Sequence, residues 1–232
     1  MSENALPYAN DQLEEDVTID VGDVSLGGTL GVPRESTGVV LFAHGSGSSR
    51  FSARNRFVAR VLRDAGIATL LLDLLSPSEE EVDLVTRHHR FDIAMLADRL
   101  VAAIDWLATE ASTRNLRVGL FGASTGGGAA LVAAAERPIR VAAVVSRGGR
   151  PDLAEDALPV VRAPTLLIVG ERDEEVIDLN ERARDHMRAE TRLEIVPRAT
   201  HLFEEPGALE EVARLARVWF LQRLSSAGLT DQ

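Results

Sequence analysis

Residues 116–131, LRVGLFGASTGGGAAL, decide the fold that we expect for this chain. Residues 118–121 are largely apolar and predict a short buried strand, and the small residues that follow Thr125 predict a helix. Between them, residues 122–126 form a G-x-S-x-G pattern in a strand–turn–helix context. Such a turn holds its serine in strained backbone geometry, and glycine on both sides avoids collisions with the strand and the helix. We therefore expect Ser124 Oγ to stand exposed above a sheet, at the positive end of the following helix.

The composition excludes several kinds of chemistry. All 25 basic residues are Arg, because the chain has no Lys, and it has no Cys either. A lysine Schiff base, a Ser–Lys dyad, a cysteine nucleophile, a thiolate zinc site and a Walker-type phosphate loop are therefore out of reach. The net charge of −11 argues against binding to nucleic acid or to an anionic membrane surface, because both need a basic footprint.

The chain has 232 residues, of which 45% are hydrophobic, and this suffices for one substantial core. We expect an acidic tail over residues 1–15, a single domain over residues 16–226 and a short tail over residues 227–232. There is no signal-peptide pattern and no apolar run near the roughly 18 residues of a membrane span. The sequence therefore predicts a soluble cytoplasmic protein.

The other apolar segments predict strands that alternate with helices. Residues 17–21 and 24–32 predict an antiparallel hairpin at a sheet edge, whereas residues 76–81 look acidic and turn-like. Further strands are expected at residues 39–43, 67–72, 141–145, 165–169 and 192–196, and helices at residues 51–65, 91–109, 176–189 and 207–224. This order predicts a three-layer α/β/α sandwich with a mostly parallel sheet and no separate lid domain. Its ligands would bind beyond the carboxyl ends of the strands.

Two other polar segments have predicted roles. Residues 44–49, HGSGSS, follow a buried strand, and their glycines let backbone N–H groups approach a ligand closely. A dinucleotide fingerprint is not predicted there, because Arg50 replaces the third glycine. We interpret His44 as a structural residue beneath this loop. The adjacent His88 and His89 have no ligand-type partner at i+4, so no metal site is expected.

Ser124, Asp173 and His201 each follow a predicted strand at its carboxyl end, in the order nucleophile, acid, base. With these residues the chain resembles an α/β-hydrolase of the small dienelactone-hydrolase-like group, over about residues 17–224. The resemblance implies that Ser124 is the nucleophile, Asp173 the acid and His201 the base, with the N–H groups of Ser46 and Thr125 as oxyanion donors. It also implies two-step acyl transfer on a small-molecule ester without a cofactor.

Several alternatives stay open at this point. Asp152, Glu171 and Asp178 are other candidates for the acid, and Asp173 could instead cap the following helix. Dienelactone hydrolases resemble this chain but carry Cys at the nucleophile, which argues against dienelactone itself as the substrate. Ester, lactone, thioester and amide hydrolysis share the same residues. A slow-turnover, receptor-like ligand-binding protein is the alternative function on this fold.

Arginines accompany the predicted ligand edge. Arg50 and Arg54 follow residues 44–49, the predicted oxyanion loop. Arg147 and Arg150 follow the predicted strand at residues 141–145, which comes after the helix that begins beside Ser124. Guanidinium groups bind carboxylate or phosphate through two parallel hydrogen bonds. We therefore expect up to four guanidinium groups near a substrate that carries an anionic group, with solvated surface arginines as the alternative.

Overall fold

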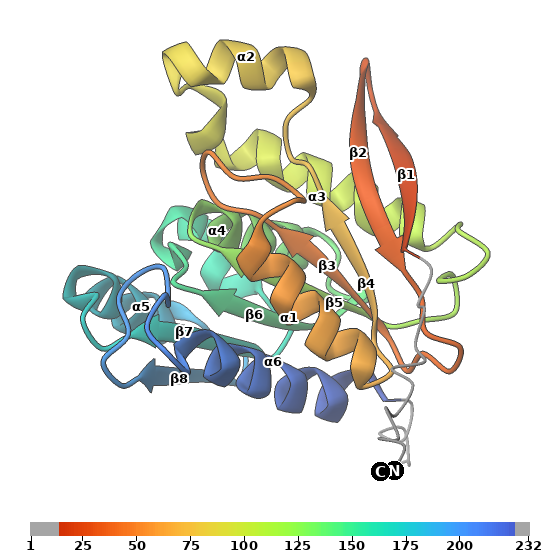
Figure 1. Ribbon diagram of the computed structural model, residues 1–232. Helices are drawn as coiled ribbons and strands as arrows, with labels where there is room; N and C mark the ends of the chain where they lie inside the picture. Colours follow the sequence, from red (N-terminus) through yellow and green to blue (C-terminus); the bar gives the residue numbers. More distant parts are fainter. Residues whose placement is uncertain (1–13, 226–232) are drawn as a thin grey trace, which may run out of the picture.

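The computed structural model describes residues 14–225, and these contain one eight-stranded sheet in the order β1-β2-β4-β3-β5-β6-β7-β8 (Figure 1). The strands are β1 (Glu14–Val21), β2 (Val24–Gly31), β3 (Val39–Ala43), β4 (Ala68–Leu72), β5 (Val118–Ala123), β6 (Val141–Arg147), β7 (Thr165–Gly170) and β8 (Thr191–Val196). The β1–β2 hairpin is antiparallel and joins β4 in antiparallel register, whereas all other neighbouring strands pair in parallel. This confirms the predicted α/β class with an antiparallel N-terminal hairpin at one edge.

Helices cover both faces of the sheet. The helices α1 (Ala53–Asp64) and α6 (Ala208–Leu224) enclose one hydrophobic core with one face (Figure 1). On the other face lie α3 (Ile93–Leu107), α4 (Thr125–Glu136) and α5 (Glu174–His186). Short 3₁₀ segments, η1 (His89–Phe91) and η2 (Pro151–Val160), complete the chain with α2 (Pro77–Thr86). The strand–helix alternation places the carboxyl ends of the parallel strands along one edge, where ligands of such sheets bind.

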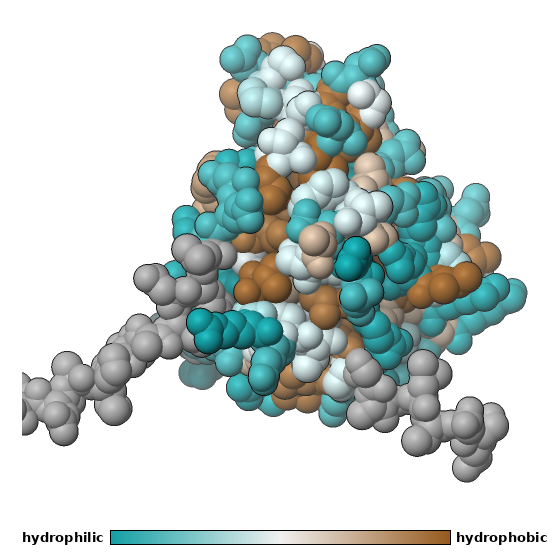
Figure 2. All heavy atoms as spheres, turned by 90° about the vertical axis from the view of Figure 1, so that its right-hand side faces the viewer, coloured by the Kyte–Doolittle hydropathy of each residue, from teal (hydrophilic) through white to brown (hydrophobic). Residues whose placement is uncertain are grey.

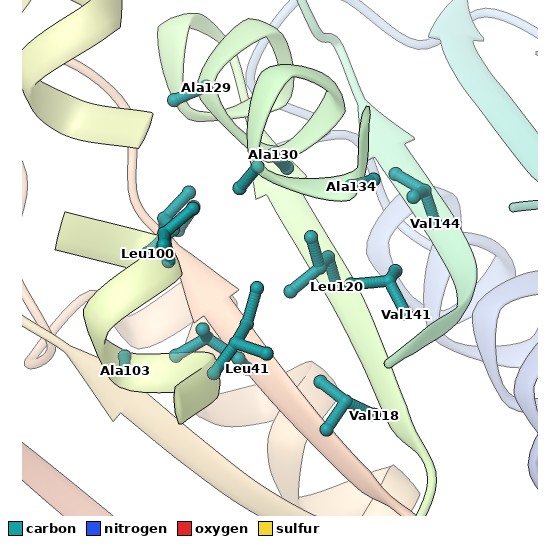
Figure 3. Packing of buried hydrophobic residues seen from close by; sticks show 14 of the residues in the cluster. Leu41, Leu100, Ala103, Val118, Leu120, Ala129, Ala130, Ala134, Val141 and Val144 are labelled. Carbon is teal, nitrogen blue, oxygen red and sulfur yellow. The ribbon is translucent and has the colours of Figure 1, made fainter. Parts of the chain in front are cut away.

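Helix α4 packs close to the sheet because its first two turns consist almost entirely of glycine and alanine. Ala129, Ala130 and Ala134 are fully buried, and Figure 3 shows them over the sheet face that carries Leu120 and Val144. Small side chains let the helix axis approach the strands, so the start of α4 is fixed directly beyond the end of β5. That position determines where the serine between them points.

Residues 76–81, which we expected to form an acidic turn, begin helix α2 instead. Ser76 caps this helix: its hydroxyl accepts from Glu79 N–H, and the Glu79 carboxylate accepts from Ser76 N–H. This reciprocal capping box, with Pro77 in the first turn, stabilises a helix start that the S-P-S-E sequence does encode. The pattern was missed because α2 has no apolar face directed at the core.

Helix α2 projects from the edge of the sheet where the strands end (Figure 1). Its residues Val82, Leu84 and Val85 are 51%, 69% and 86% exposed. Figure 2 shows the projecting top of the molecule, with hydrophobic residues among hydrophilic ones. Helix α2 therefore depends on its cap and on polar contacts rather than on burial of apolar side chains.

Strand β1 begins at Glu14, two residues inside the segment that we expected to be a tail. The rest of that predicted tail, and the predicted C-terminal tail, lie outside the described residues. Over residues 14–225, no helix combines the length and the apolarity that crossing a membrane requires.

Candidate active site

Ser124 occupies a sharp turn between β5 and α4, with backbone angles φ 51° and ψ −123°. A residue other than glycine rarely adopts a positive φ, and holding it there costs about 1–3 kcal/mol. Surrounding hydrogen bonds fix this conformation: Ser124 N–H donates to Arg147 O at 3.3 Å, and Arg150 N–H donates to Ser124 O at 3.0 Å. The strained turn lifts the serine side chain out of the sheet and leaves it partly exposed.

Glycine is needed on both sides of Ser124 for steric reasons. A Cβ on Gly122 would lie 2.5 Å from Gly126 O, inside the first turn of α4. A Cβ on Gly126 would lie 2.5 Å from Ala43 O, at the carboxyl end of β3. Strand, turn and helix are thus packed backbone to backbone, which no larger residue would permit.

His201 and Asp173 form a short hydrogen bond at the same edge of the sheet. Asp173 is the third residue after β7, and its Oδ2 lies 2.6 Å from His201 Nδ1 in the loop after β8. The buried Phe203 anchors that loop in the core of the α1–α6 face. His201 is partly exposed and lines the same cavity as Ser124, a space of about 210 Å³. The imidazole thus has a carboxylate at one nitrogen and faces the serine cavity.

The other candidates for the acid are engaged elsewhere. Asp152 pairs with Arg150, Glu171 accepts from Arg198 N–H at 2.6 Å, and Asp178 is exposed on α5. Asp173 stands at the N-cap position of α5, yet its side chain makes no capping hydrogen bond. The capping alternative therefore does not describe its side chain, which bonds to His201 instead.

Residues 44–49, which we predict to be the oxyanion loop, lie beside the start of α4. Ser46 Oγ is 3.1 Å from Thr125 Oγ1, so these residues are in direct contact. Thr125 is the first residue of α4, and the N–H groups of a first helical turn have no partner within their helix. Together with the positive end of the helix dipole, this arrangement favours a negative charge next to Ser124.

His44 lies beneath this loop and is buried, as we expected. Its Nδ1 lies 3.0 Å from Gly45 O, and its Nε2 accepts from Leu74 N–H at 2.9 Å. Nε2 must therefore be unprotonated, and burial lowers the pKa of the imidazole below its usual 6.5. A neutral His44 fixes the loop to the end of β4.

Arg54 and Arg147 line the Ser124 cavity. The Arg147 side chain is only 5% exposed and donates to Asn55 Oδ1 at 3.3 Å. Within residues 14–225 it has no carboxylate partner, and its Nε lacks a hydrogen bond. Burial and the nearby Arg54 lower the pKa of Arg147 to about 10. Arg54 itself lies 3.3 Å from Glu204.

Arg50 and Arg150, by contrast, do not line this cavity. Arg50 lies 3.3 Å from Asp73 and borders a separate hollow beside β1, and both carboxylate oxygens of Asp152 bind Arg150. The guanidinium groups of Arg50 and Arg150 are therefore neutralised by the neighbouring carboxylates of Asp73 and Asp152. Of the four arginines expected near the substrate, the structure brings two to the serine.

The cavity is also lined by residues that no sequence pattern had indicated. Asn55, which is 2% exposed, orients Arg147, and Ser48, Ser52 and Leu202 complete the wall. Asn55 lies on α1, far from Arg147 in the chain, so no local pattern could join the pair. Among the described residues, no group of three or more His, Asp and Glu side chains could hold a metal ion.

Comparisons with known proteins agree with this geometry. The family model of the dienelactone hydrolase family matches residues 26–222 of the chain. A crystal structure of dienelactone hydrolase from Anabaena variabilis is 64% identical, with a TM-score of 0.90, and covers 91% of this chain and 98% of its own. Est1E from Butyrivibrio proteoclasticus shares the fold at 18% identity, with a TM-score of 0.74 over 89% of this chain and 98% of its own.

A curated Mycobacterium tuberculosis protein, named "Putative phosphoribosyl transferase", is 57% identical over 215 residues. These residues are 93% of this chain but 48% of that protein, so the chain spans about half the length of this relative. The match over residues 26–222 covers the whole sheet from β3 to β8 and the Ser124 cavity. The chain therefore belongs to the dienelactone hydrolase family and has the α/β-hydrolase fold.

Proposed function

We propose that this protein is a serine hydrolase that cleaves a carboxylic ester, or a lactone or thioester, of a small substrate. Ser124 would be the nucleophile, His201 the base and Asp173 the acid. One observation carries the proposal: a strained, partly exposed serine shares a cavity with a histidine whose Nδ1 lies 2.6 Å from a carboxylate. Strain of this kind persists only where the surrounding structure enforces it.

The first half of the reaction would acylate Ser124. As Oγ attacks the carbonyl carbon, its proton passes to His201, and the carbonyl π-electron pair moves to the carbonyl oxygen. The N–H groups of Ser46 and Thr125, at the start of α4, would stabilise this oxyanion. When the oxyanion collapses, the bond to the leaving group breaks, and the His201 proton goes to the departing alcohol or thiol.

The second half would repeat these steps with water. His201 takes a proton from a water molecule, whose oxygen attacks the acyl carbon, and the acid is released as Ser124 Oγ recovers the proton. Asp173 would hold the imidazole with Nδ1 protonated and Nε2 free to act as the base. It would also stabilise the imidazolium that forms in each half.

Arg147 and Arg54 support a substrate with an anionic group. A guanidinium that is 5% exposed, with an amide oxygen but no described carboxylate as its partner, is an incompletely compensated buried charge. A carboxylate or phosphate on the substrate would complete its hydrogen bonds. The net charge of −11 repels anions at long range, so this attraction must act locally.

Activity-based labelling tests the proposal most directly. We expect a fluorophosphonate probe to label the wild type and p-nitrophenyl acetate to be turned over many times per molecule. Ser124→Ala should lose both activities, because an exposed hydroxyl contributes chemistry and little packing. Ser112→Ala, at an exposed turn after α3, is the matched control and should keep both. Equal labelling of Ser124→Ala and the wild type would refute the assignment.

The same assay addresses the receptor-like alternative. A single slow turnover with retained product would favour a ligand-binding role, and repeated turnover an enzyme. The phosphoribosyl transferase name belongs to a relative about twice the length of the matched region, so we do not assign that activity to the Ser124 cavity.

A pair of esters tests whether the enzyme prefers a substrate with an anionic group. An acyl ester with a nearby carboxylate should exceed its neutral isostere in kcat/KM by about tenfold, the order expected for one charge-assisted hydrogen bond. Arg147→Met should remove this advantage by raising KM for the charged ester, whereas Arg140→Met, in the exposed turn before β6, should retain it. Equal kcat/KM for the two esters in the wild type would show that the arginines do not select the substrate.

A further inference from the structure

The projecting α2–η1 segment contacts the oxyanion loop at Arg90 of η1. Ser46 Oγ donates to Arg90 O at 3.4 Å. The Arg90 guanidinium lies against Gly47, whose φ is 68°, with Nη1 3.4 Å from where a Cβ would be. Arg90 therefore contacts two consecutive residues of the loop.

Asp83 of α2 fixes Arg90 through several hydrogen bonds. Its carboxylate accepts from Arg90 N–H at 3.1 Å and from Arg90 Nε at 2.6 Å, and its backbone carbonyl accepts from Nη2 at 3.2 Å. Asp83 is 1% exposed. Burial alone would raise the pKa of this carboxyl, but the hydrogen bonds from Arg90 outweigh it and lower the pKa. Asp83 is thus a buried charge whose hydrogen bonds come mainly from Arg90, through both its backbone and its guanidinium group.

The loop itself has little means of holding its shape. It consists of glycine and serine after His44, and it has one internal backbone hydrogen bond, from Ser48 N–H to Gly45 O at 3.1 Å. Glycine-rich backbone loses more entropy on ordering than other sequences do. Contacts from outside must therefore hold Ser46 in its place at the wall of the serine cavity.

These contacts form a continuous path. It runs from the Asp83 carboxylate to Arg90, from Arg90 O to Ser46 Oγ, and from Ser46 Oγ to Thr125 Oγ1 at 3.1 Å. Its last two members are the residues whose N–H groups we assign to the oxyanion. The same four residues border a small cavity of about 50 Å³ under α2, which does not include Ser124.

We propose that Asp83 and Arg90 are positioning residues that hold the oxyanion loop in its reactive geometry without touching the substrate. This inference rests on the proposed function, because it assigns the pair to the oxyanion site of the same hydrolase. A loop released from Arg90 would still bind substrate, since neither residue lines the Ser124 cavity. It would stabilise the tetrahedral intermediate less well, because that interaction depends on donor placement within a fraction of an ångström.

Asp83→Asn tests the inference, with Asp105→Asn as the matched control. Asp105 also binds one arginine through two hydrogen bonds, to Arg137 at 3.0 and 2.8 Å, but on the exposed surface between α3 and α4. Both variants are compared with the wild type at a temperature well below their melting points. The measurements are kcat and KM for p-nitrophenyl acetate and the rate of fluorophosphonate labelling.

We expect Asp83→Asn to lower kcat and the labelling rate about tenfold, with KM within twofold of the wild type. Asp105→Asn should stay within twofold in every measurement. If Asp83→Asn does not fold, Arg90→Lys, which keeps the cation but not the guanidinium contacts, should show the same loss. Asp83→Glu, which keeps the carboxylate, should recover part of it.

Three results would overturn the inference: an Asp83→Asn enzyme within twofold of the wild type, an equal loss in Asp105→Asn, or an effect on KM alone. An unchanged Asp83→Asn enzyme would show that the pair does not act on the loop. An equal loss in Asp105→Asn would show a general effect of lost stability. An effect on KM alone would show that the pair contacts the substrate. A wild type that neither labels nor turns over esters would refute the proposed function, and the inference with it.

Discussion

Replacing Ser124 by Gly or by Ala separates the strain at this residue from its chemistry. Its angles, φ 51° and ψ −123°, lie near the first central position of a type II′ turn, about +60° and −120°. Glycine adopts these angles freely, whereas any Cβ opposes them. Both variants remove the hydroxyl that we propose as the nucleophile, but only Ser124→Gly also releases the strain. The glycine variant should therefore be the more stable of the two.

The difference in the free energy of unfolding between Ser124→Gly and Ser124→Ala follows from two opposing contributions. Strain at such a residue costs about 1–3 kcal/mol, and Ala retains it. Glycine costs about 0.5–1 kcal/mol more than Ala in conformational entropy. The net advantage of Ser124→Gly over Ser124→Ala is then about 1 kcal/mol, which corresponds to about 3 °C in a chain of this size.

Thermal unfolding followed by circular dichroism measures this difference. The control is the same pair of substitutions at Ser112, an exposed turn residue outside the set with positive φ. There, Gly should be less stable than Ala. If Ser124→Gly melts at or below Ser124→Ala, the turn carries no strain of the predicted size.

Three further predictions concern Asp173, His44 and Gly122. Asp173→Asn should lower kcat by about 10⁴ with little change in KM, because the amide favours the wrong tautomer of His201; an unchanged kcat would point to another acid. Burial lowers the pKa of His44 in the folded state, so the unfolded chain binds its proton more readily, and the free energy of unfolding should fall as the pH drops below about 6.5. Urea titrations at pH 7.5 and 5.5 should show a smaller fall for His44→Gln than for the wild type, and equal falls would contradict the assignment. Gly122→Ala should destabilise the fold by about 3 kcal/mol in urea unfolding, because its Cβ would lie 2.5 Å from the backbone of α4.

The sequence carried enough information for the sheet, because buried parallel strands are continuous apolar runs that helices separate. The predicted strand at residues 39–43 matches β3, and the others differ from the observed bounds by two residues or fewer, apart from the three residues that β1 gains at its start. Ser124 and His201 can also be selected from the sequence alone, since Ser124 directly follows β5 and His201 lies in the loop after β8. The G-x-S-x-G motif indicated the serine, and the alternation of strands and helices indicated that Ser124 and His201 lie at the same edge of the sheet.

Features that depend on contacts between distant residues could not be predicted. Helix α2 was missed because a helix held by a cap and by Asp83 shows no apolar period. The four arginines were indistinguishable in the sequence. Asp73, which follows β4, neutralises Arg50, whereas Arg147 binds the uncharged side chain of Asn55. The two arginines are distinguished by these distant partners and not by a local sequence pattern.

The packing of Gly126 against the end of β3 has a consequence for the order of folding. Strands β3 and β5 pair at Val39 and Val118, so the turn at Ser124 cannot close until chain segments on both sides of α1 and α3 have met. Pairing between such distant segments is slow compared with helix formation. The serine that we propose as the nucleophile should therefore become reactive late, and during refolding its labelling should lag behind the recovery of helical circular dichroism. Labelling of Ser124 would in this way detect only the fully folded domain. An incompletely folded chain would not expose Ser124 as a nucleophile to the metabolites around it.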